Sequence, residues 1–382
     1  MTTDFLVIGG GMAGASAAYF LAERGRVQLL EREDAPGYHT TGRSAATFTE
    51  NYGTPAVRGL VQAGADFLRH PPAGFSEAPL MHPRGWITVA PPGQEKQLEE
   101  SSEVALRAIP TMRMIDRKEA LALCPILKPD CVGAALHEPD AMDLDVHAIH
   151  QGFLRGMRAR GGVIATGAEV RSLARRDGVW VATTSAGTFY APVVLNAAGA
   201  WADEIAKLAG ARPVGLVPKR RTAFTVDPPA GHDPGRWPFV DDFRGLVYFK
   251  PEAGRILVSP MDETPSPPCD AQPEDLDVAE AVSRLEEIAE IEVKRVVRKW
   301  AGLRSFVSDH TPVVGPVPEA PGYIWLAGQG GVGIMTSPAL GRLAAALAAG
   351  DAFPSALTAL GARAEQLLPG RLTTMALLWN SR

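Results

Sequence analysis

The chain has 382 residues, of which 46% are hydrophobic and 21% charged, and its net charge is −5. This length suggests two or three domains with buried cores. The negative charge gives no reason to expect nucleic acid or an anionic membrane as a partner. No apolar run reaches the roughly 18 residues that span a bilayer, and the first residues lack a signal-peptide pattern. Three scattered cysteines suit neither a disulfide framework nor a zinc site, so we expect a cytoplasmic protein without a bound metal.

The N-terminal segment predicts a β-α-β unit that binds a dinucleotide. Residues 5–8 and 27–30 are short apolar runs, and residues 13–24 between them have helical spacing. The turn before the helix fits G-x-G-x-x-G, which lets a pyrophosphate approach the helix N-terminus. An acidic residue follows the second run, where a carboxylate accepts hydrogen bonds from ribose hydroxyls. The predicted contacts are therefore Gly9, Gly11, Met12, Ala13, Gly14 and Glu31.

A second glycine-rich turn, at 328–333, favours FAD over NAD as the bound dinucleotide. It follows an apolar run at 323–327 and precedes a predicted helix over 338–349. The flavin of FAD lies far from its pyrophosphate, so one chain commonly uses a second turn to hold it. The N-terminus of the later helix would favour the negative charge of reduced flavin. We therefore predict FAD as the cofactor.

The remaining elements predict an α/β fold in which one domain interrupts another. Further apolar runs at 163–165 and 193–196, the first preceded by an amphipathic helix over 146–160, suit a parallel sheet. Other stretches carry more proline, aromatic residues and alternating strands, such as 246–250 and 255–259. We predict a Rossmann-like FAD-binding domain with an inserted, mostly antiparallel α+β substrate domain. The first comprises residues 1–80, 142–212 and 302–382, and the second residues 81–141 and 213–301.

Several ordered blocks of the sequence resemble the D-amino-acid oxidase superfamily of flavoproteins, and most closely the bacterial D-arginine dehydrogenases. These blocks are residues 31–32, 37–46, 196–201, 218–221, 300–306 and 329–334. The resemblance runs essentially from end to end, and it implies that the FAD is bound non-covalently. It implies that a further set of residues contacts FAD, namely Arg32, Thr41, Arg43, Ser44, Ala45, Ala46, Val170, Ala198, Gly199, Trp201, Gly330, Gly331, Val332, Gly333 and Ile334.

The same resemblance implies a clamp for the carboxylate of an amino acid. Arg221 and Tyr248 match the arginine and tyrosine that hold this group, Tyr52 matches a lid residue, and Arg304 matches a further arginine. The chemistry is reasonable, because a guanidinium binds a carboxylate through two hydrogen bonds and a phenol adds a directional donor.

Three departures from the family alter the expected pocket. Trp86 replaces a glutamate that receives a cationic side chain, Thr47 replaces a histidine near the flavin, and Met335 replaces a glutamine. All three make the pocket less suited to a guanidinium. Together with Phe239 and Gly331 they favour a neutral, apolar or aromatic D-amino acid.

One departure points the other way. Asp241 stands where the family has an apolar pocket residue, and Glu50 lies in the predicted lid. Asp241 could restore an acidic wall for cationic or amino-bearing substrates. Alternatively, Asp241 and Asp242 are a solvated pair in a loop.

The resemblance implies oxidative deamination of a D-amino acid. A hydride passes from the α-carbon to flavin N5, and the imino acid is hydrolysed to a 2-oxo acid and ammonia. We expect a dehydrogenase that uses an unidentified electron acceptor and has altered side-chain specificity. The alternatives are a secondary-amine (sarcosine- or proline-like) or 2-hydroxy-acid oxidoreductase, an oxygen-using oxidase, and an FAD-binding electron-transfer subunit without turnover.

Overall fold

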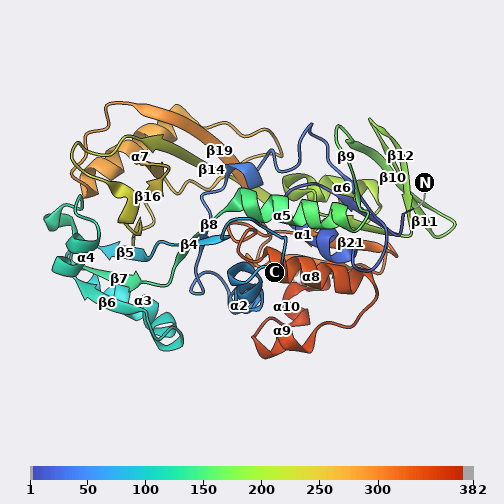
Figure 1. Ribbon diagram of the computed structural model, residues 1–382, viewed down its shortest axis with the longest axis horizontal. Helices are drawn as coiled ribbons and strands as arrows, with labels where there is room; N and C mark the ends of the chain where they lie inside the picture. Colours follow the sequence, from blue (N-terminus) through green and yellow to red (C-terminus); the bar gives the residue numbers. More distant parts are fainter. Residues whose placement is uncertain (1–2, 373–382) are drawn as a thin grey trace, which may run out of the picture.

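The computed structural model describes residues 3–372, whose strands form two large sheets in opposite halves of an elongated molecule (Figure 1). The predicted ends of the FAD-binding domain, residues 1–2 and 373–382, lie outside this range. The boundaries between the two predicted domains stay a prediction. Strand β19 (Val296–Phe306) runs through one of them, at residues 301–302.

Within the described range, the first sheet has six strands in the order β20-β21-β13-β1-β2-β9. Its strands pair in parallel, apart from the antiparallel pair of β20 and β21. All the strands predicted for it form with the predicted bounds. Four of them are short apolar runs that are buried along most of their length, whereas β9, at the edge of the sheet, is partly exposed. The bounds are β1 Phe5–Ile8, β2 Val27–Leu30, β9 Val163–Ala165, β13 Val193–Asn196, β20 Val313–Pro316 and β21 Tyr323–Ala327.

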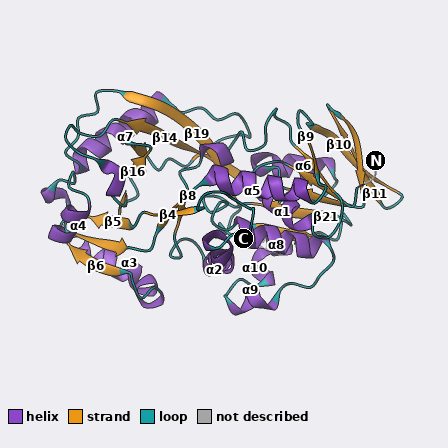
Figure 2. Cartoon of the chain, in the orientation of Figure 1, coloured by secondary structure: helices purple, strands orange, loops and turns teal. Residues whose placement is uncertain are grey.

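Helices cover this sheet, and α1, α5 and α8 lie side by side (Figure 2). Small residues allow the close approach: a Cβ on Gly341 of α8 would lie 2.7 Å from the backbone of Ser16 in α1. Helix α1 ends earlier than its predicted bound of 24, because residues 22–25 turn back onto its last carbonyls. The helices of this half are α1 Met12–Leu21, α2 Pro55–Arg69, α5 Val146–Ala159, α6 Ala202–Leu208, α8 Ser337–Ala348, α9 Ser355–Ala359 and α10 Ala364–Leu367.

The second sheet follows the order β18-β14-β17-β16-β15-β5-β7-β6, and β19 also pairs with β14. Its neighbours are antiparallel except β5 and β15, which confirms the mostly antiparallel prediction. Strand β16 begins two residues later than predicted, because Gly245 closes a turn onto Asp242. The strands other than β19 are β5 Trp86–Ala90, β6 Arg113–Asp116, β7 Ala134–Glu138, β14 Val217–Val226, β15 Phe239–Asp242, β16 Tyr248–Glu252, β17 Arg255–Ser259 and β18 Thr264–Pro265. The helices of this half are α3 Glu95–Ala108, α4 Arg117–Leu123 and α7 Asp275–Ile288.

Two small sheets complete the fold. Strands β10 (Val170–Arg176), β11 (Val179–Thr184) and β12 (Gly187–Ala191) form an antiparallel meander. Strand β8 (Met142–Leu144) lies between β3 (Thr47–Phe48) and β4 (Met81–Pro83). The carboxylate of Asp143 in β8 accepts hydrogen bonds of 2.7 Å from both Lys250 and Arg84. Lys250 belongs to β16, so this buried ion cluster ties the small sheet to the antiparallel one.

Candidate active site

Residues from both large sheets line one cavity of about 590 Å³, the usual size of a ligand pocket. Nearly all of the predicted site residues meet there. They are Gly9, Gly11, Met12, Ala13, Glu31, Arg32, Thr41, Arg43, Ser44, Ala45, Ala46, Thr47, Tyr52, Trp86, Val170, Ala198, Gly199, Trp201, Arg221, Phe239, Asp241, Tyr248, Arg304, Gly330, Gly331, Gly333, Ile334 and Met335.

Three predicted residues lie outside the lining. Gly14 and Val332 pack behind the two glycine turns. Glu50 turns away from the cavity, and its carboxylate accepts a hydrogen bond of 3.1 Å from Arg69 in α2. The structure therefore brings Tyr52, but not Glu50, to the predicted lid position.

The first glycine turn leaves no space for side chains. Gly9 has a φ of +103°, and a Cβ there would lie 2.4 Å from the carbonyl oxygen of Ala197. A Cβ on Gly14 would lie 1.9 Å from the carbonyl oxygen of Gly9. The turn therefore presents bare backbone to the cavity at the N-terminus of α1, as a pyrophosphate requires.

Glu31 is fixed in the cavity wall. Its two carboxylate oxygens accept hydrogen bonds of 2.9 Å from the backbone N–H groups of Gly10 and Glu33. Next to it, the guanidinium of Arg32 lies 4.7 Å above the ring of Trp201. This end of the cavity suits the ribose and adenine of a dinucleotide.

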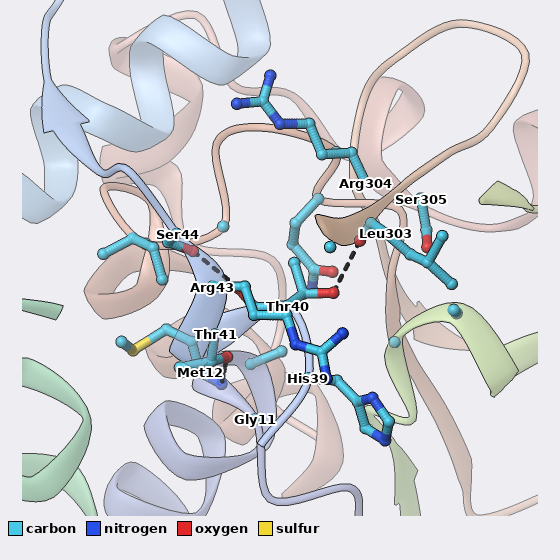
Figure 3. A pocket seen from close by; sticks show the side chains of 18 of the residues that line it. Gly11, Met12, His39, Thr40, Thr41, Arg43, Ser44, Leu303, Arg304 and Ser305 are labelled. Carbon is cyan, nitrogen blue, oxygen red and sulfur yellow. Dashed lines mark hydrogen bonds between the residues drawn. The ribbon is translucent and has the colours of Figure 1, made fainter. Parts of the chain in front are cut away.

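The loop 37–46 is tied to both halves of the molecule (Figure 3). Thr41 Oγ1 accepts a hydrogen bond of 2.9 Å from the backbone of Met12, and Thr40 donates one of 2.8 Å to the carbonyl of Leu303. Arg43 donates to the carbonyls of Ala271 and Ala301, at 2.9 Å each. Because these bonds direct the guanidinium of Arg43 toward the substrate half, its predicted contact with FAD stays a prediction.

Two polar atoms on residues of the cavity wall are buried without a hydrogen-bond partner among the described residues. They are Oγ1 of Thr47 and Nε2 of Gln329. Such atoms are rare in folded proteins, and here they suit a polar ligand. Together with the glycine turns and Glu31, they make the lining fit FAD. Gln329 was not among the predicted site residues, although its place at the start of the second glycine turn was a usable signal.

Aromatic rings from three neighbouring strands form a row at the other end of the cavity. The ring of Phe239 lies 4.1 Å from that of Trp86 and 4.9 Å from that of Tyr248, measured between centroids. Phe239 pairs with Trp86 in the sheet, so their side chains stand on the same face. This face forms a wide apolar wall.

Asp241 shares that face, two residues after Phe239. Trp86 Nε1 donates a hydrogen bond of 2.7 Å to its carboxylate. Burial raises the pKa of Asp241 to about 6, although the hydrogen bonds from Trp86 and Thr88 oppose the rise. Asp242 is buried on the opposite face, where Arg244 binds it at 2.6 Å. The alternative of a solvated loop pair is therefore wrong: both residues belong to β15, and Asp241 lines the cavity.

Two guanidinium groups lie near each other in the cavity wall. Arg221 is 9% exposed and donates to the carbonyl of Asp262 at 2.8 Å and to Glu263 at 3.2 Å. Burial lowers the pKa of Arg221, and the charge of Arg304 lowers it further. The guanidinium of Arg304 forms no hydrogen bond or ion pair with any residue between 3 and 372, although its charge helps to lower the pKa of Glu263. Arg304 Nη1 lies 3.1 Å from the position of a Cβ on Gly331, so this free cation lies beside the second glycine turn.

Thr49 and Glu138 are further residues that the sequence reasoning missed. Thr49 lines the cavity, and its hydroxyl lies 2.8 and 2.7 Å from the two carboxylate oxygens of Glu138. Glu138 ends β7 and pairs with Trp86. An acidic residue at an inward position of an alternating strand was the available signal. Within the described range, no group of three or more His, Cys, Asp or Glu side chains could hold a metal ion, and no helix is long and apolar enough to cross a membrane.

Residues 4–347 match the family model for DAO, described as FAD-dependent oxidoreductase. The hydrogen cyanide synthase subunit HcnC of Pseudomonas aeruginosa is 24% identical, over 90% of this chain and 91% of its own. The crystal structure of glycine oxidase from Geobacillus kaustophilus has a TM-score of 0.81 and 22% identity, over 92% of this chain and 95% of its own. L-proline dehydrogenase from P. horikoshii also has a TM-score of 0.81 and 22% identity, over 98% of both chains. The chain belongs to the DAO family of FAD-dependent oxidoreductases, and its cofactor is FAD.

Proposed function

We propose that the protein oxidatively deaminates a D-amino acid. In this proposal it is a dehydrogenase related to D-arginine dehydrogenase, with a changed side-chain pocket. One observation carries the proposal: the guanidinium of Arg304 has no partner in the described structure and lies in the cavity near that of Arg221. Asp262 and Glu263 offset part of the positive charge, but the donors of Arg304 stay free, so the two neighbouring cations form a site for an anion.

A substrate carboxylate is the anion that best suits this place. Arg304 has all its donors free for a two-bond contact, whereas Glu263 and the carbonyl of Asp262 already hold Arg221. Tyr248 lines the same cavity and adds a phenolic donor. We infer that Arg304 binds the carboxylate directly, and that Arg221 adds positive charge from a fixed position.

The chain's contribution to the reaction is binding and orientation. Bound FAD supplies the acceptor for the hydride of the α-carbon. Holding the carboxylate at Arg304, beside the second glycine turn, fixes where the α-carbon lies. Tyr52, at the cavity mouth and 46% exposed, would close over the substrate and exclude water. The substrate amine must be neutral at transfer, and the imino product is hydrolysed in water.

The substrate side chain would lie along the aromatic row. Trp86 and Phe239 favour an apolar or aromatic group. Asp241 adds a carboxylate to the same wall. The side chains that donate hydrogen bonds to this carboxylate, Trp86 and Thr88, are both neutral. A cationic side chain would therefore find its counter-charge at Asp241, so the wall allows two substrate classes.

The test is anaerobic mixing of the holoenzyme with candidate substrates while the flavin absorbance is recorded. The panel contains D-arginine, D-lysine, D-leucine and D-phenylalanine, their L-enantiomers, sarcosine, L-proline and a 2-hydroxy acid. We expect bleaching by at least one D-amino acid, and faster bleaching than by its L-enantiomer. Bleaching by the secondary amines or the hydroxy acid alone would contradict the proposal. No bleaching by any compound would favour an electron-transfer subunit.

Two further measurements sharpen the result. Admitting air to the bleached enzyme separates a dehydrogenase, which we expect to reoxidise slowly, from an oxidase that forms peroxide quickly. The variant Asp241→Asn separates the substrate classes. If the wall selects cations, the variant loses kcat/KM for D-lysine and D-arginine and keeps it for D-leucine and D-phenylalanine.

A further inference from the structure

A buried glutamate lies next to Trp86, at the end of the aromatic row and outside the cavity lining. Glu138 ends β7 directly opposite Trp86, so its side chain stands on the cavity-facing side of the sheet. It is 7% exposed. Its nearest polar partner is the hydroxyl of Thr49, at 2.8 and 2.7 Å from the two carboxylate oxygens. No basic group pairs with it in residues 3–372.

Thr49 begins the segment that carries Tyr52. Residues 49–53 join β3 to α2 and form neither helix nor strand. Thr49 Oγ1 also accepts a hydrogen bond of 3.1 Å from the backbone of Asn51, which fixes the start of this segment. Thr54 fixes its other end, where its hydroxyl caps α2. Between these anchors Tyr52 is 46% exposed and lines the cavity.

We propose that Glu138 is a positioning residue, which holds segment 49–52 in place through Thr49 and so keeps Tyr52 at the mouth of the cavity. The inference rests on the proposed function only for the role of Tyr52 toward substrate. Glu138 itself contacts neither the cavity nor any reacting atom. Its contacts with the segment are the hydroxyl of Thr49 and the backbone N–H of Glu50, so changing its carboxyl leaves the residues of the cavity wall as they are.

The charge of Glu138 decides how firmly the segment is held. Burial is the main cause that raises the pKa of Glu138 to about 7, and the charges of Glu50 and Asp140 raise it further. Hydrogen bonds from Thr49 and the backbone of Glu50 lower it. The nearby cation, Arg69, is occupied by Glu50. A segment that opens exposes the carboxyl to water and returns its pKa toward 4.5.

The direction of the pH effect follows from the linkage between proton binding by Glu138 and closure of the segment. Because the carboxyl has the higher pKa in the closed arrangement, the neutral form favours closure and ionisation favours opening. Closure is therefore complete below the pKa of the open arrangement and is lost as pH rises through about 7. One unit above the pKa of the open arrangement, the opening equilibrium is expected to be about tenfold larger than in the neutral protein.

Hydrogen exchange of the holoenzyme tests the anchor without any substrate. Protection of peptide 47–53, corrected for intrinsic rates, is measured at about pH 6 and about pH 8. We expect wild-type protection to fall about tenfold between them. Glu138→Gln keeps size and hydrogen bonding but stays neutral, so it should remain protected at both values. Thr49→Val removes the hydroxyl and should lose protection at both, while Thr49→Ser restores it.

Kinetics with an accepted substrate provide the second readout. The ratio of the KM of wild type to that of Glu138→Gln should rise by up to about tenfold from about pH 6 to about pH 8, because KM follows the closed fraction, while kcat changes little. The substrate amine titrates in the same way with both proteins, so its effect on KM cancels in this ratio. Asp140→Asn is a matched variant: it removes one charge that raises the pKa of Glu138 and should move the midpoint to lower pH.

The outcomes separate the two proposals. Equal protection of peptide 47–53 in wild type, Glu138→Gln and Thr49→Val overturns the anchor. Loss of protection in Thr49→Val without pH dependence in wild type overturns the charge effect. If protection changes as expected but KM does not, the anchor stands and the role of Tyr52 in the proposed function fails.

Discussion

The two ends of the cavity are built in different ways. At the cofactor end, backbone atoms define the surface, because a side chain at Gly9 or Gly14 would clash with the neighbouring backbone. At the substrate end, side chains from separate strands define it, as in the row of Trp86, Phe239 and Tyr248. The first kind of surface admits almost no substitution. The second can change its chemistry residue by residue while the sheet beneath it stays the same.

The largest effect is expected at the cofactor end. In Gly14→Ala the new methyl group would lie 1.9 Å from the carbonyl of Gly9, so α1 must move away from the turn. We expect most bound flavin to be lost, together with more than about 3 kcal/mol of the free energy of unfolding. Flavin absorbance per protein and thermal unfolding measure both.

Gly64→Ala is the control for that change. Gly64 lies in α2, and the new methyl group would lie 3.4 Å from Pro338 of α8, an ordinary van der Waals distance. The control should keep its flavin and its stability. A Gly14→Ala protein with full flavin content would remove the distinction between the two ends.

Within the substrate end, the two arginines should behave differently. Arg304→Met removes a cation that has no partner in the described chain, so we expect kcat/KM to fall about 100-fold with little change in thermal stability. Arg221→Met also leaves the carbonyl of Asp262 without its donor and Glu263 with Lys219 alone, so it should lose stability as well as activity. An equal loss of melting temperature in both variants would show that Arg304 has a structural partner.

A smaller effect is expected from Asp241, through pH. Burial raises its pKa from 3.8 to about 6, so ionisation is disfavoured in the folded state. Wild type should therefore lose stability relative to Asp241→Asn as pH rises through this window, by at most about 3 kcal/mol. Denaturant unfolding at about pH 4 and about pH 7 measures the difference. Asp130→Asn, an exposed carboxylate, should show no such trend. A constant difference for Asp241→Asn would mean that its carboxyl is not buried.

The sequence predicted the cofactor end well, because its signals are local. The turn containing Gly9 and the strands around it are contiguous, and Glu31 follows at a fixed spacing. The strands of the parallel sheet could be placed for the same reason. The sequence patterns did not predict the details of the segment between β2 and α2, which contains a short 3₁₀ turn at Thr41–Arg43 and strand β3.

The substrate end depends on contacts that no local pattern reveals. Trp86 and Asp241 are 155 positions apart, and their hydrogen bond requires β5 and β15 to pair in parallel within an otherwise antiparallel sheet. Glu138 lies beside Trp86 only because β7 pairs with β5. The resemblance to a family named several cavity residues but could not show that Trp86 and Asp241 form one hydrogen-bonded unit.

The pairing of β1 with β13 also has a consequence for synthesis of the chain. Phe5 faces Val193 in the central pair of the parallel sheet, and the next strand outward, β21, ends at Ala327. Strand β1 therefore has no partner on one side until β13, far later in the chain, has been synthesised. Closing so long a loop is slow, because its entropy must be lost before the pair forms. Until then, the apolar strand β1 depends on chaperones or on the neighbouring helix α1 for cover.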